Sequence, residues 1–62
     1  MPKIIIEMLE GRSLEQKREL VRRVTQDVSE TARIAPEEIH IIIHENSREN
    51  VAQNGKLLCD NT

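Results

Sequence analysis

The chain has 62 residues, of which 37% are hydrophobic and none is Phe, Tyr or Trp. Nine basic and eleven acidic residues give a net charge of −2, which argues against the basic surface and stacking aromatic rings of a nucleic-acid-binding protein. The longest apolar runs, at residues 4–6 and 41–43, are far shorter than the roughly 20 residues that cross a bilayer. We therefore expect neither nucleic acid nor a membrane as a partner.

A chain of this length is expected to form a single domain over residues 1–62. Domains this small bury only about 60% of the surface of the unfolded chain, and most need a disulfide, a metal or a partner chain for stability. Cys59 is the only cysteine, so no disulfide forms within the chain, and a lone thiol is typical of the reducing cytoplasm. The first residues also lack the pattern of a signal peptide. We expect a cytoplasmic protein that other subunits stabilise.

The first predicted element is a strand over residues 3–9, a stretch rich in β-branched side chains that Gly11 ends. Ser13 and Gln16 then form the pattern of a capping box, in which each side chain satisfies an unpaired backbone N–H at the start of a helix. Apolar residues recur at helical spacing from Leu14 to about Arg33, which predicts an amphipathic helix there.

The second half of the chain predicts a turn, a strand and a loop. Pro36 ends the helical region and starts a short turn, and residues 39–44 form the second predicted strand. Residues 45–55 are polar and typical of a loop, and the apolar residues 57–59 are expected to form a final edge strand. A strand, a helix of about five turns and a strand predict one right-handed parallel β-α-β unit, an α/β (α+β) fold with a short C-terminal tail.

Both predicted strands carry apolar side chains on both faces. Strands of this kind are typically buried on both sides of a sheet, whereas one helix covers only one face of a two-stranded sheet. We therefore expect other subunits to cover the second face, which makes the protein an obligate oligomer. The second face contains Ile5, Leu9 and Ile42, opposite to Ile4, Ile6, Ile41 and Ile43.

Several short motifs follow one another along the chain. Met1-Pro2 directly precedes the first strand, Leu-Glu-Gly-Arg-Ser at residues 9–13 leads into Glu-Gln-Lys at 15–17, and Pro-Glu-Glu at 36–38 precedes the apolar second strand. Glu-Asn at 45–46 then leads into a tail that contains Gly55. In a chain of 62 residues, this combination resembles the 4-oxalocrotonate tautomerase family over essentially the whole sequence.

The resemblance implies a hexamer built as a trimer of dimers, in which each dimer has a four-stranded sheet backed by two helices. It also implies that Met1 is removed and that the secondary amine of Pro2 acts as a general base, which moves a proton between carbons of a small unsaturated keto or enol acid. Arg12 matches a family arginine that binds the substrate carboxylate. Pro2 and Arg12 are thus the predicted catalytic residues, and no cofactor is expected.

The chemistry of Pro2 and Arg12 suits this assignment. A base that works near pH 7 needs a largely unprotonated amine, and burial among apolar side chains or a nearby cation such as Arg12 lowers the pKa of an amine. From Pro2 to Leu9 a strand rises roughly 23 Å, so Arg12 cannot reach the Pro2 of its own chain. If two first strands pair antiparallel across a dimer, Arg12 lies beside the partner's Pro2.

Two positions depart from the family pattern. His40 stands where the family's enzyme for oxalocrotonate carries a second catalytic arginine, and Val51 stands where an aromatic residue usually lines the site. Both are predicted substrate-binding residues, but a histidine lacks the bidentate fork that grips a carboxylate, and a merely half-exposed strand histidine fits His40 equally well. These departures weaken the case for a dicarboxylate substrate. His40 and His44 lie about 13 Å apart on one strand, too far to bind one metal ion.

Three functions remain open on this sequence. The first is a tautomerase that acts on a small carboxylate substrate through Pro2 and Arg12. The second is a catalytically silent oligomeric protein with the same fold, which His40 and Val51 favour. The third is a related hydratase or decarboxylase that uses the same amine.

Overall fold

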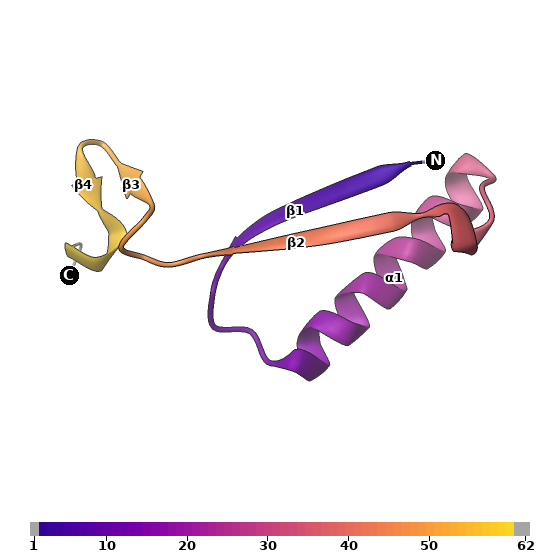
Figure 1. Cartoon of the computed structure of the whole chain (residues 1–62), viewed down its shortest axis with the longest axis horizontal. Helices are drawn as coiled ribbons and strands as arrows, with labels where there is room; N and C mark the ends of the chain where they lie inside the picture. The colour runs from indigo at the N-terminus through magenta and orange to yellow at the C-terminus, as the bar shows by residue number, and fades with distance from the viewer. Residues whose placement is uncertain (1, 61–62) are drawn as a thin grey trace.

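One helix lies against a two-stranded parallel sheet in the computed structural model, which describes residues 2–60 (Figure 1). The strands β1 (Lys3–Leu9) and β2 (His40–Asn46) pair along all seven residues of each. The helix α1 (Leu14–Ala32) and the short 3-10 helix η1 (Pro36–Glu38) connect them. This arrangement confirms the predicted β-α-β unit. No helix within residues 2–60 is long and apolar enough to cross a membrane.

Local sequence signals set the ends of α1. Gly11 has a φ of +126°, which residues with a side chain rarely adopt, and it turns the chain out of β1. The Ser13 hydroxyl accepts a hydrogen bond from the Gln16 backbone N–H at 3.1 Å, and the Gln16 side-chain oxygen accepts one from the Ser13 N–H at 2.8 Å. Arg33 ends the helix in the left-handed conformation typical of a C-terminal cap. The capping box and the predicted span of the helix are therefore confirmed.

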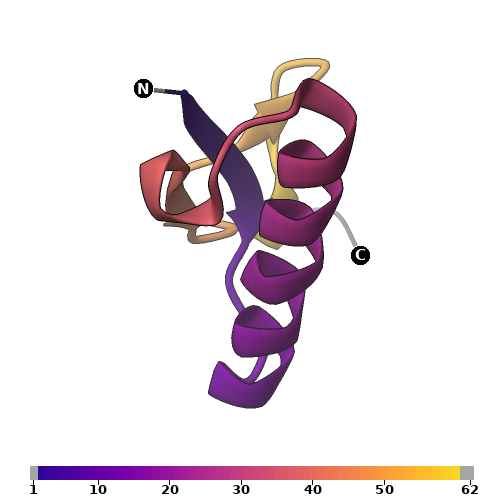
Figure 2. The same cartoon turned by 90° about the vertical axis from the view of Figure 1, so that its right-hand side faces the viewer.

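The helix covers one face of the sheet, as Figure 2 shows. The strand residues on this face are half-buried, and Ile39, just before β2, is the only residue of the described chain that is buried, with 9% of its surface exposed. Lys17 on α1 forms an ion pair with Glu45 on β2 at 2.7 Å, which ties the first turns of the helix to the carboxyl end of the sheet. The half-buried residues of this face are Ile4, Ile6, Met8, Ile41 and Ile43.

The other face of the sheet, here called the open face, is not covered by residues 2–60. Ile5 and Ile42 lie opposite each other across the two strands, and 54% and 39% of their surfaces are exposed. Two adjacent exposed isoleucines at the centre of a sheet are unusual for a chain that is stable alone, because apolar side chains of this size gain stability mainly through burial. The expectation of a second apolar face, uncovered by the chain itself, is confirmed.

The dimensions of the chain agree with an incomplete core. Its extents are 43 × 23 × 14 Å and its radius of gyration is 14.9 Å, whereas a compact chain of this length has a radius of about 11 Å. Its accessible surface is 5058 Å², compared with about 4100 Å² for a compact monomer of the same mass. A single chain thus leaves much of its apolar surface unburied.

The second strand and the tail differ from the prediction. The strand begins at His40 and continues through Glu45 and Asn46, so the predicted span of residues 39–44 was wrong at both ends. The polar residues 45 and 46 remain in the strand because Met8 and Leu9 of β1 pair with them. Long-range pairing here overrides the low strand propensity of Glu and Asn.

The predicted loop contains a small hairpin. The strands β3 (Ala52–Gln53) and β4 (Lys56–Leu57) pair antiparallel, and a second 3-10 helix, η2 (Leu58–Asp60), follows them. Asn54 and Gly55 form the turn with φ values of 53° and 79°, as expected for an Asn-Gly hairpin turn. Of the predicted apolar tail at residues 57–59, only Leu57 lies in a strand, and that strand, β4, pairs with β3 and not with the parallel sheet. The hairpin extends beyond the carboxyl end of β2 (Figure 1).

Candidate active site

Pro2 and His40 lie together at the amino end of the sheet. The His40 backbone N–H donates a hydrogen bond to the Pro2 carbonyl oxygen at 3.1 Å, which extends the parallel ladder one residue beyond β1. Pro2 is half-buried and His40 is exposed. Parallel pairing therefore brings these two predicted site residues side by side within one chain. Met1, whose removal the resemblance implies, lies outside the described residues.

Lys3 joins these residues at the same end. It lies directly opposite His40 in the register of the two strands, and both residues are exposed on the open face. Neither forms an ion pair with another residue of the range 2–60. Lys3 was not among the predicted site residues.

Arg12 lies at the opposite end of the sheet from Pro2. It follows β1, and its Nη1 donates a hydrogen bond to the Leu9 carbonyl oxygen at 3.2 Å. The side chain is exposed and forms no ion pair within the described residues, so its remaining donors are available to an external carboxylate. The seven residues of β1 span roughly 23 Å, and Arg12 therefore lies out of reach of the Pro2 of its own chain.

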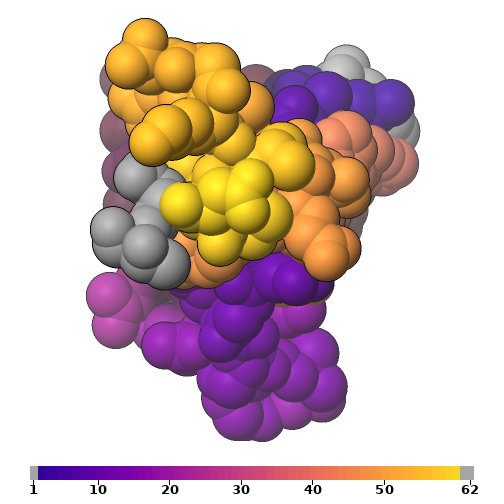
Figure 3. Space-filling model, turned by 90° about the vertical axis from the view of Figure 1, so that its left-hand side faces the viewer, coloured from indigo at the N-terminus to yellow at the C-terminus, as the bar shows by residue number. Residues whose placement is uncertain are grey.

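Val51 also lies away from Pro2. It precedes β3, is half-buried, and its carbonyl oxygen accepts a hydrogen bond from the Leu58 N–H at 2.9 Å, which closes the base of the hairpin. Figure 3 looks at this end of the molecule and shows the hairpin and the following turn, in orange and yellow, above the purple start of α1. A single chain thus places Pro2 and His40 at one end of the sheet and Arg12 and Val51 at the other.

A polar cluster lies on the open face toward the carboxyl end of the sheet. One Glu7 oxygen accepts a hydrogen bond from the Asn46 side-chain amide at 3.2 Å, and the other lies 3.9 Å from Nδ1 of His44. His44 is thus engaged with Glu7 across the strands, separately from His40. Within residues 2–60, no three His, Cys, Asp or Glu side chains are close enough to hold a metal ion.

A network of charged side chains lies on the exposed face of α1. Glu19 Oε2 accepts hydrogen bonds from Arg22 and Arg23, each at 2.7 Å. These bonds lower the pKa of the Glu19 carboxyl from 4.5 to about 2, and the bond to Glu19 raises the pKa of Arg22. The network lies on the helix surface and includes none of the predicted site residues.

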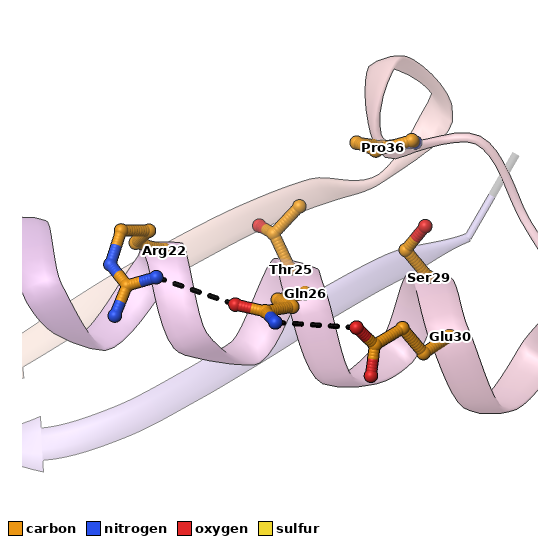
Figure 4. A pocket seen from close by; sticks show the side chains of 6 residues that line it. All are labelled: Arg22, Thr25, Gln26, Ser29, Glu30 and Pro36. Carbon is orange, nitrogen blue, oxygen red and sulfur yellow. Dashed lines mark hydrogen bonds between the residues drawn. The ribbon is translucent and has the colours of Figure 1, made fainter.

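A surface hollow of about 310 Å³ lies between α1 and η1 (Figure 4). Its polar groups bond one another along the helix, from Arg22 to the Gln26 oxygen at 3.3 Å and from the Gln26 amide to Glu30 at 3.2 Å. Neither Pro2 nor Arg12 borders it, so it lies apart from these predicted catalytic residues. The hollow is lined by Arg22, Thr25, Gln26, Ser29, Glu30 and Pro36.

Comparison with known proteins identifies the family. Residues 2–61 match the family of tautomerase enzymes. The chain is 45% identical over 60 residues to a 2-hydroxymuconate tautomerase from Bacillus subtilis (strain 168), and the match covers 97% of both chains. The solved structure of a 4-oxalocrotonate tautomerase homologue shares 40% identity with a TM-score of 0.92, covering 97% of this chain and 95% of that one.

A further solved structure adds an assembly to this comparison. It is a heterohexamer 4-oxalocrotonate tautomerase from Chloroflexus aurantiacus J-10-fl, which is 32% identical with a TM-score of 0.88 over 97% of each chain. The agreement in both sequence and fold extends over nearly the whole chain. The chain therefore belongs to the tautomerase family and is an isomerase of the 4-oxalocrotonate tautomerase type.

Proposed function

We propose that this protein interconverts the enol and keto tautomers of a small unsaturated 2-oxo or 2-hydroxy acid, with the amine of Pro2 as the general base. The observation that carries the proposal is the position of Pro2. Its carbonyl is fixed by the bond from His40 at the amino end of the sheet, and its ring is half-buried. Removal of Met1 frees a secondary amine on this rigid ring, and a positioned base typically contributes about 10²–10⁴ in rate.

Arg12 of a neighbouring subunit is the second part of the proposed site. β1 pairs only with β2 in the described chain, so its other edge is free to pair with a second chain. Antiparallel pairing of two β1 strands makes a four-stranded sheet and places the end of one strand beside the start of the other. Arg12 of one subunit then lies next to Pro2 of the other, where its guanidinium binds the substrate carboxylate and stabilises the developing enolate.

The proposed assembly is a homohexamer. The exposed pair Ile5 and Ile42 requires a cover that residues 2–60 do not provide, and a two-stranded sheet alone is marginally stable in water. In this hexamer, three dimers with four-stranded sheets pack against one another through their open faces. This packing covers the exposed isoleucines. The heterohexameric relative with the same chain fold supports this assembly.

His40 and Val51 complete the proposed site as substrate-binding residues. His40 lies beside Pro2 in the same chain and offers an imidazole hydrogen bond to the substrate. Val51 belongs to the hairpin at the end where Arg12 lies, so it contributes an apolar wall from the neighbouring subunit. The substrate named for the Bacillus subtilis relative, 2-hydroxymuconate, is the first compound to test.

The proposal is tested by comparing chains with a free and a blocked Pro2. The rate of ketonisation of 2-hydroxymuconate is measured against pH for the processed chain and for a chain that uniformly retains Met1, at equal assembly state. The processed chain is expected to be active, the blocked chain inactive, and Pro2→Ala, which leaves a primary amine, reduced but active. Equal rates for the free and blocked chains would contradict the role of Pro2.

Product analysis separates the remaining alternatives. A catalytically silent protein with this fold shows no ketonisation even with a free Pro2. A hydratase or decarboxylase releases a hydrated or shortened acid, which mass spectrometry distinguishes from a tautomer of unchanged mass.

A further inference from the structure

One ion pair joins α1 to the sheet within residues 2–60, and it is formed by Lys17 and Glu45. The distance from Nζ to Oε1 is 2.7 Å, and 26% and 31% of the two side chains are accessible. The arginine–glutamate pairs of α1 join residues three or four positions apart, and 44–81% of their side chains are accessible. Because partial burial reduces competition from water and salt, the Lys17–Glu45 pair is the best suited of these to hold two elements together.

Arg12 lies in the four-residue connection between β1 and α1, residues 10–13, here called the arginine loop (Figure 1). The loop leaves the sheet at Glu10, whose backbone N–H donates a hydrogen bond to the Asn46 carbonyl oxygen at 2.9 Å. Gly11 follows with a φ of +126°, and nothing in the described chain packs within 4 Å of the point where a Cβ would be. A glycine without packing contacts is the residue about which a loop turns most easily. The bond of Glu10 alone therefore leaves the rest of the loop free to turn.

The other end of the arginine loop is fixed by the first turn of α1. Ser13 is the N-cap of the helix, and its carbonyl oxygen accepts a hydrogen bond from the Lys17 N–H at 3.1 Å, so the two residues move together. The Lys17 side chain is bonded to Glu45, the neighbour of Asn46 on β2. Two adjacent residues of β2 thus hold the two ends of the loop, Asn46 through its backbone and Glu45 through its side chain.

The position of the Arg12 guanidinium depends on the course of this loop. Its Nη1 donates one hydrogen bond to the Leu9 carbonyl oxygen, and it makes no ion pair with another described residue. Building on the proposed function, we propose that Lys17 and Glu45 are positioning residues, which act through Arg12. Their ion pair fixes the arginine loop where the guanidinium meets the carboxylate of a substrate bound at Pro2 of the neighbouring subunit. A binding group must be placed accurately, because a shift of about 1 Å loses much of its effect on the rate.

The first test removes the ion pair from either side, in chains with a free Pro2. Lys17→Met keeps an unbranched side chain without the charge, and Glu45→Gln is the corresponding change of its partner. Each is expected to lower kcat/KM for 2-hydroxymuconate about fivefold, since a partly exposed ion pair shifts a conformational equilibrium by up to about that factor. The double variant should be no worse than either single variant, because all three lose the same contact. Lys17→Arg keeps a cation for Glu45 and should restore the wild-type rate.

The second test repeats Lys17→Met in a chain that lacks the Arg12 side chain. In the Arg12→Ala background there is no guanidinium to misplace, so the second substitution should cause no further loss of kcat/KM. An ion pair that only stabilises the fold would lower the activity by the same factor with or without Arg12. Urea unfolding at fixed protein concentration and sedimentation check that every variant is folded and assembled under the assay conditions.

Arg18→Met is the matched control. Arg18 adjoins Lys17 in the sequence and pairs with Glu15 within α1, so this change removes the same charge from the same turn of the helix but leaves the pair with the sheet intact. It should leave kcat/KM unchanged. Hydrogen exchange gives a readout that does not depend on turnover: the amides of the arginine loop should exchange faster in Lys17→Met than in Arg18→Met.

The outcomes separate this inference from the proposed function. If a chain with a free Pro2 does not ketonise 2-hydroxymuconate, or if Arg12→Ala keeps the wild-type rate, the proposed function fails at Pro2 or at Arg12, and the inference fails with it. If both residues are required, three results would overturn the positioning role alone. They are a wild-type rate for Lys17→Met, an equal loss in the Arg12→Ala background, and unchanged exchange in the arginine loop.

Discussion

The two ends of the β1–β2 sheet hold different parts of the proposed site. The amino end has the candidate base, Pro2, hydrogen-bonded to His40, whereas the carboxyl end has Arg12 and the hairpin with Val51. A strand of seven residues separates the ends, and no side chain bridges a span of roughly 23 Å. In one chain, neither end has both Pro2 and Arg12.

The difference between the ends follows from the parallel connection. A β-α-β unit places both strand starts at one end of the sheet and both strand exits at the other. Residues before the strands therefore meet one another, as Pro2 and His40 do, and residues after the strands collect at the far end. In the proposed dimer, two chains whose first strands pair antiparallel reunite the two ends, and the proposed function therefore links activity to assembly.

The largest expected effect comes from removing the assembly. Ile42→Asp places a carboxylate at the centre of the open face, where burial of an unpaired charge costs several kcal/mol. We expect loss of the oligomer, of the folded state and of activity, because the two ends no longer meet. Sedimentation velocity and circular dichroism at micromolar concentration measure this, and the wild type should show no folded monomer.

Leu14→Asp is the matched control for Ile42→Asp. Leu14 is also apolar and exposed, with 60% of its surface accessible, but it is the first residue of α1, where an acidic side chain favours the helix. This variant should assemble and remain active. An Ile42→Asp oligomer of wild-type size and stability would contradict the interface on the open face.

A smaller effect is expected at the carboxyl end. Arg12→Ala removes a cation that makes no ion pair within the described chain, so the assembly should survive. Loss of its bond to the substrate should cost roughly 1.5–3 kcal/mol of transition-state stabilisation, about 10- to 100-fold in kcat/KM. Arg12→Lys keeps the charge but lacks the bidentate guanidinium, so its kcat/KM should lie between those of the wild type and Arg12→Ala. Wild-type turnover by an intact Arg12→Ala oligomer would remove Arg12 from the site.

The smallest effect is expected on α1, away from both ends. The folded-state pKa of Glu19 is lowered from 4.5 to about 2 by Arg22 and Arg23. Its stabilising contribution is therefore fully present above pH 4.5 and is lost as the pH falls from 4.5 toward 2. The pair is surface-exposed, with 44% of the Glu19 side chain accessible, so the contribution is small.

Glu19→Gln measures this contribution directly. At fixed protein concentration, the difference in unfolding free energy between wild type and variant should be constant above pH 5 and shrink at lower pH, while kcat/KM is unchanged. A difference that grows on acidification, or a loss of activity, would show that the helix network does more than stabilise α1.

The regular elements could be predicted because their signals are local. The β-branched run of residues 3–9, the Ser13 capping box and Pro36 each act within a few residues, and all three elements form as predicted. The extension of β2 through Asn46 was missed because it depends on pairing with β1. The hairpin was missed although Asn54-Gly55 is a strong local turn signal, because the polar residues around it were interpreted as a loop.

The site could be predicted only where the chain's own topology sets it. The approach of His40 to Pro2 follows from parallel pairing, and the distance between Arg12 and Pro2 of the same chain follows from the length of β1. The proposed meeting of Arg12 with Pro2 depends on contacts between chains, which local sequence signals do not encode.

The most direct test of a site shared between subunits mixes two defective chains. One chain has a blocked Pro2 and an intact Arg12, and the other has a free Pro2 and Arg12→Ala; each alone has little or no activity. After the two are unfolded and refolded together in equal amounts, random pairing across a two-fold interface should rebuild about one quarter of the sites, each with Pro2 from one chain and Arg12 from the other. Recovery of about that fraction of wild-type activity is the predicted result, whereas activity that stays at the average of the two parents would contradict the shared site.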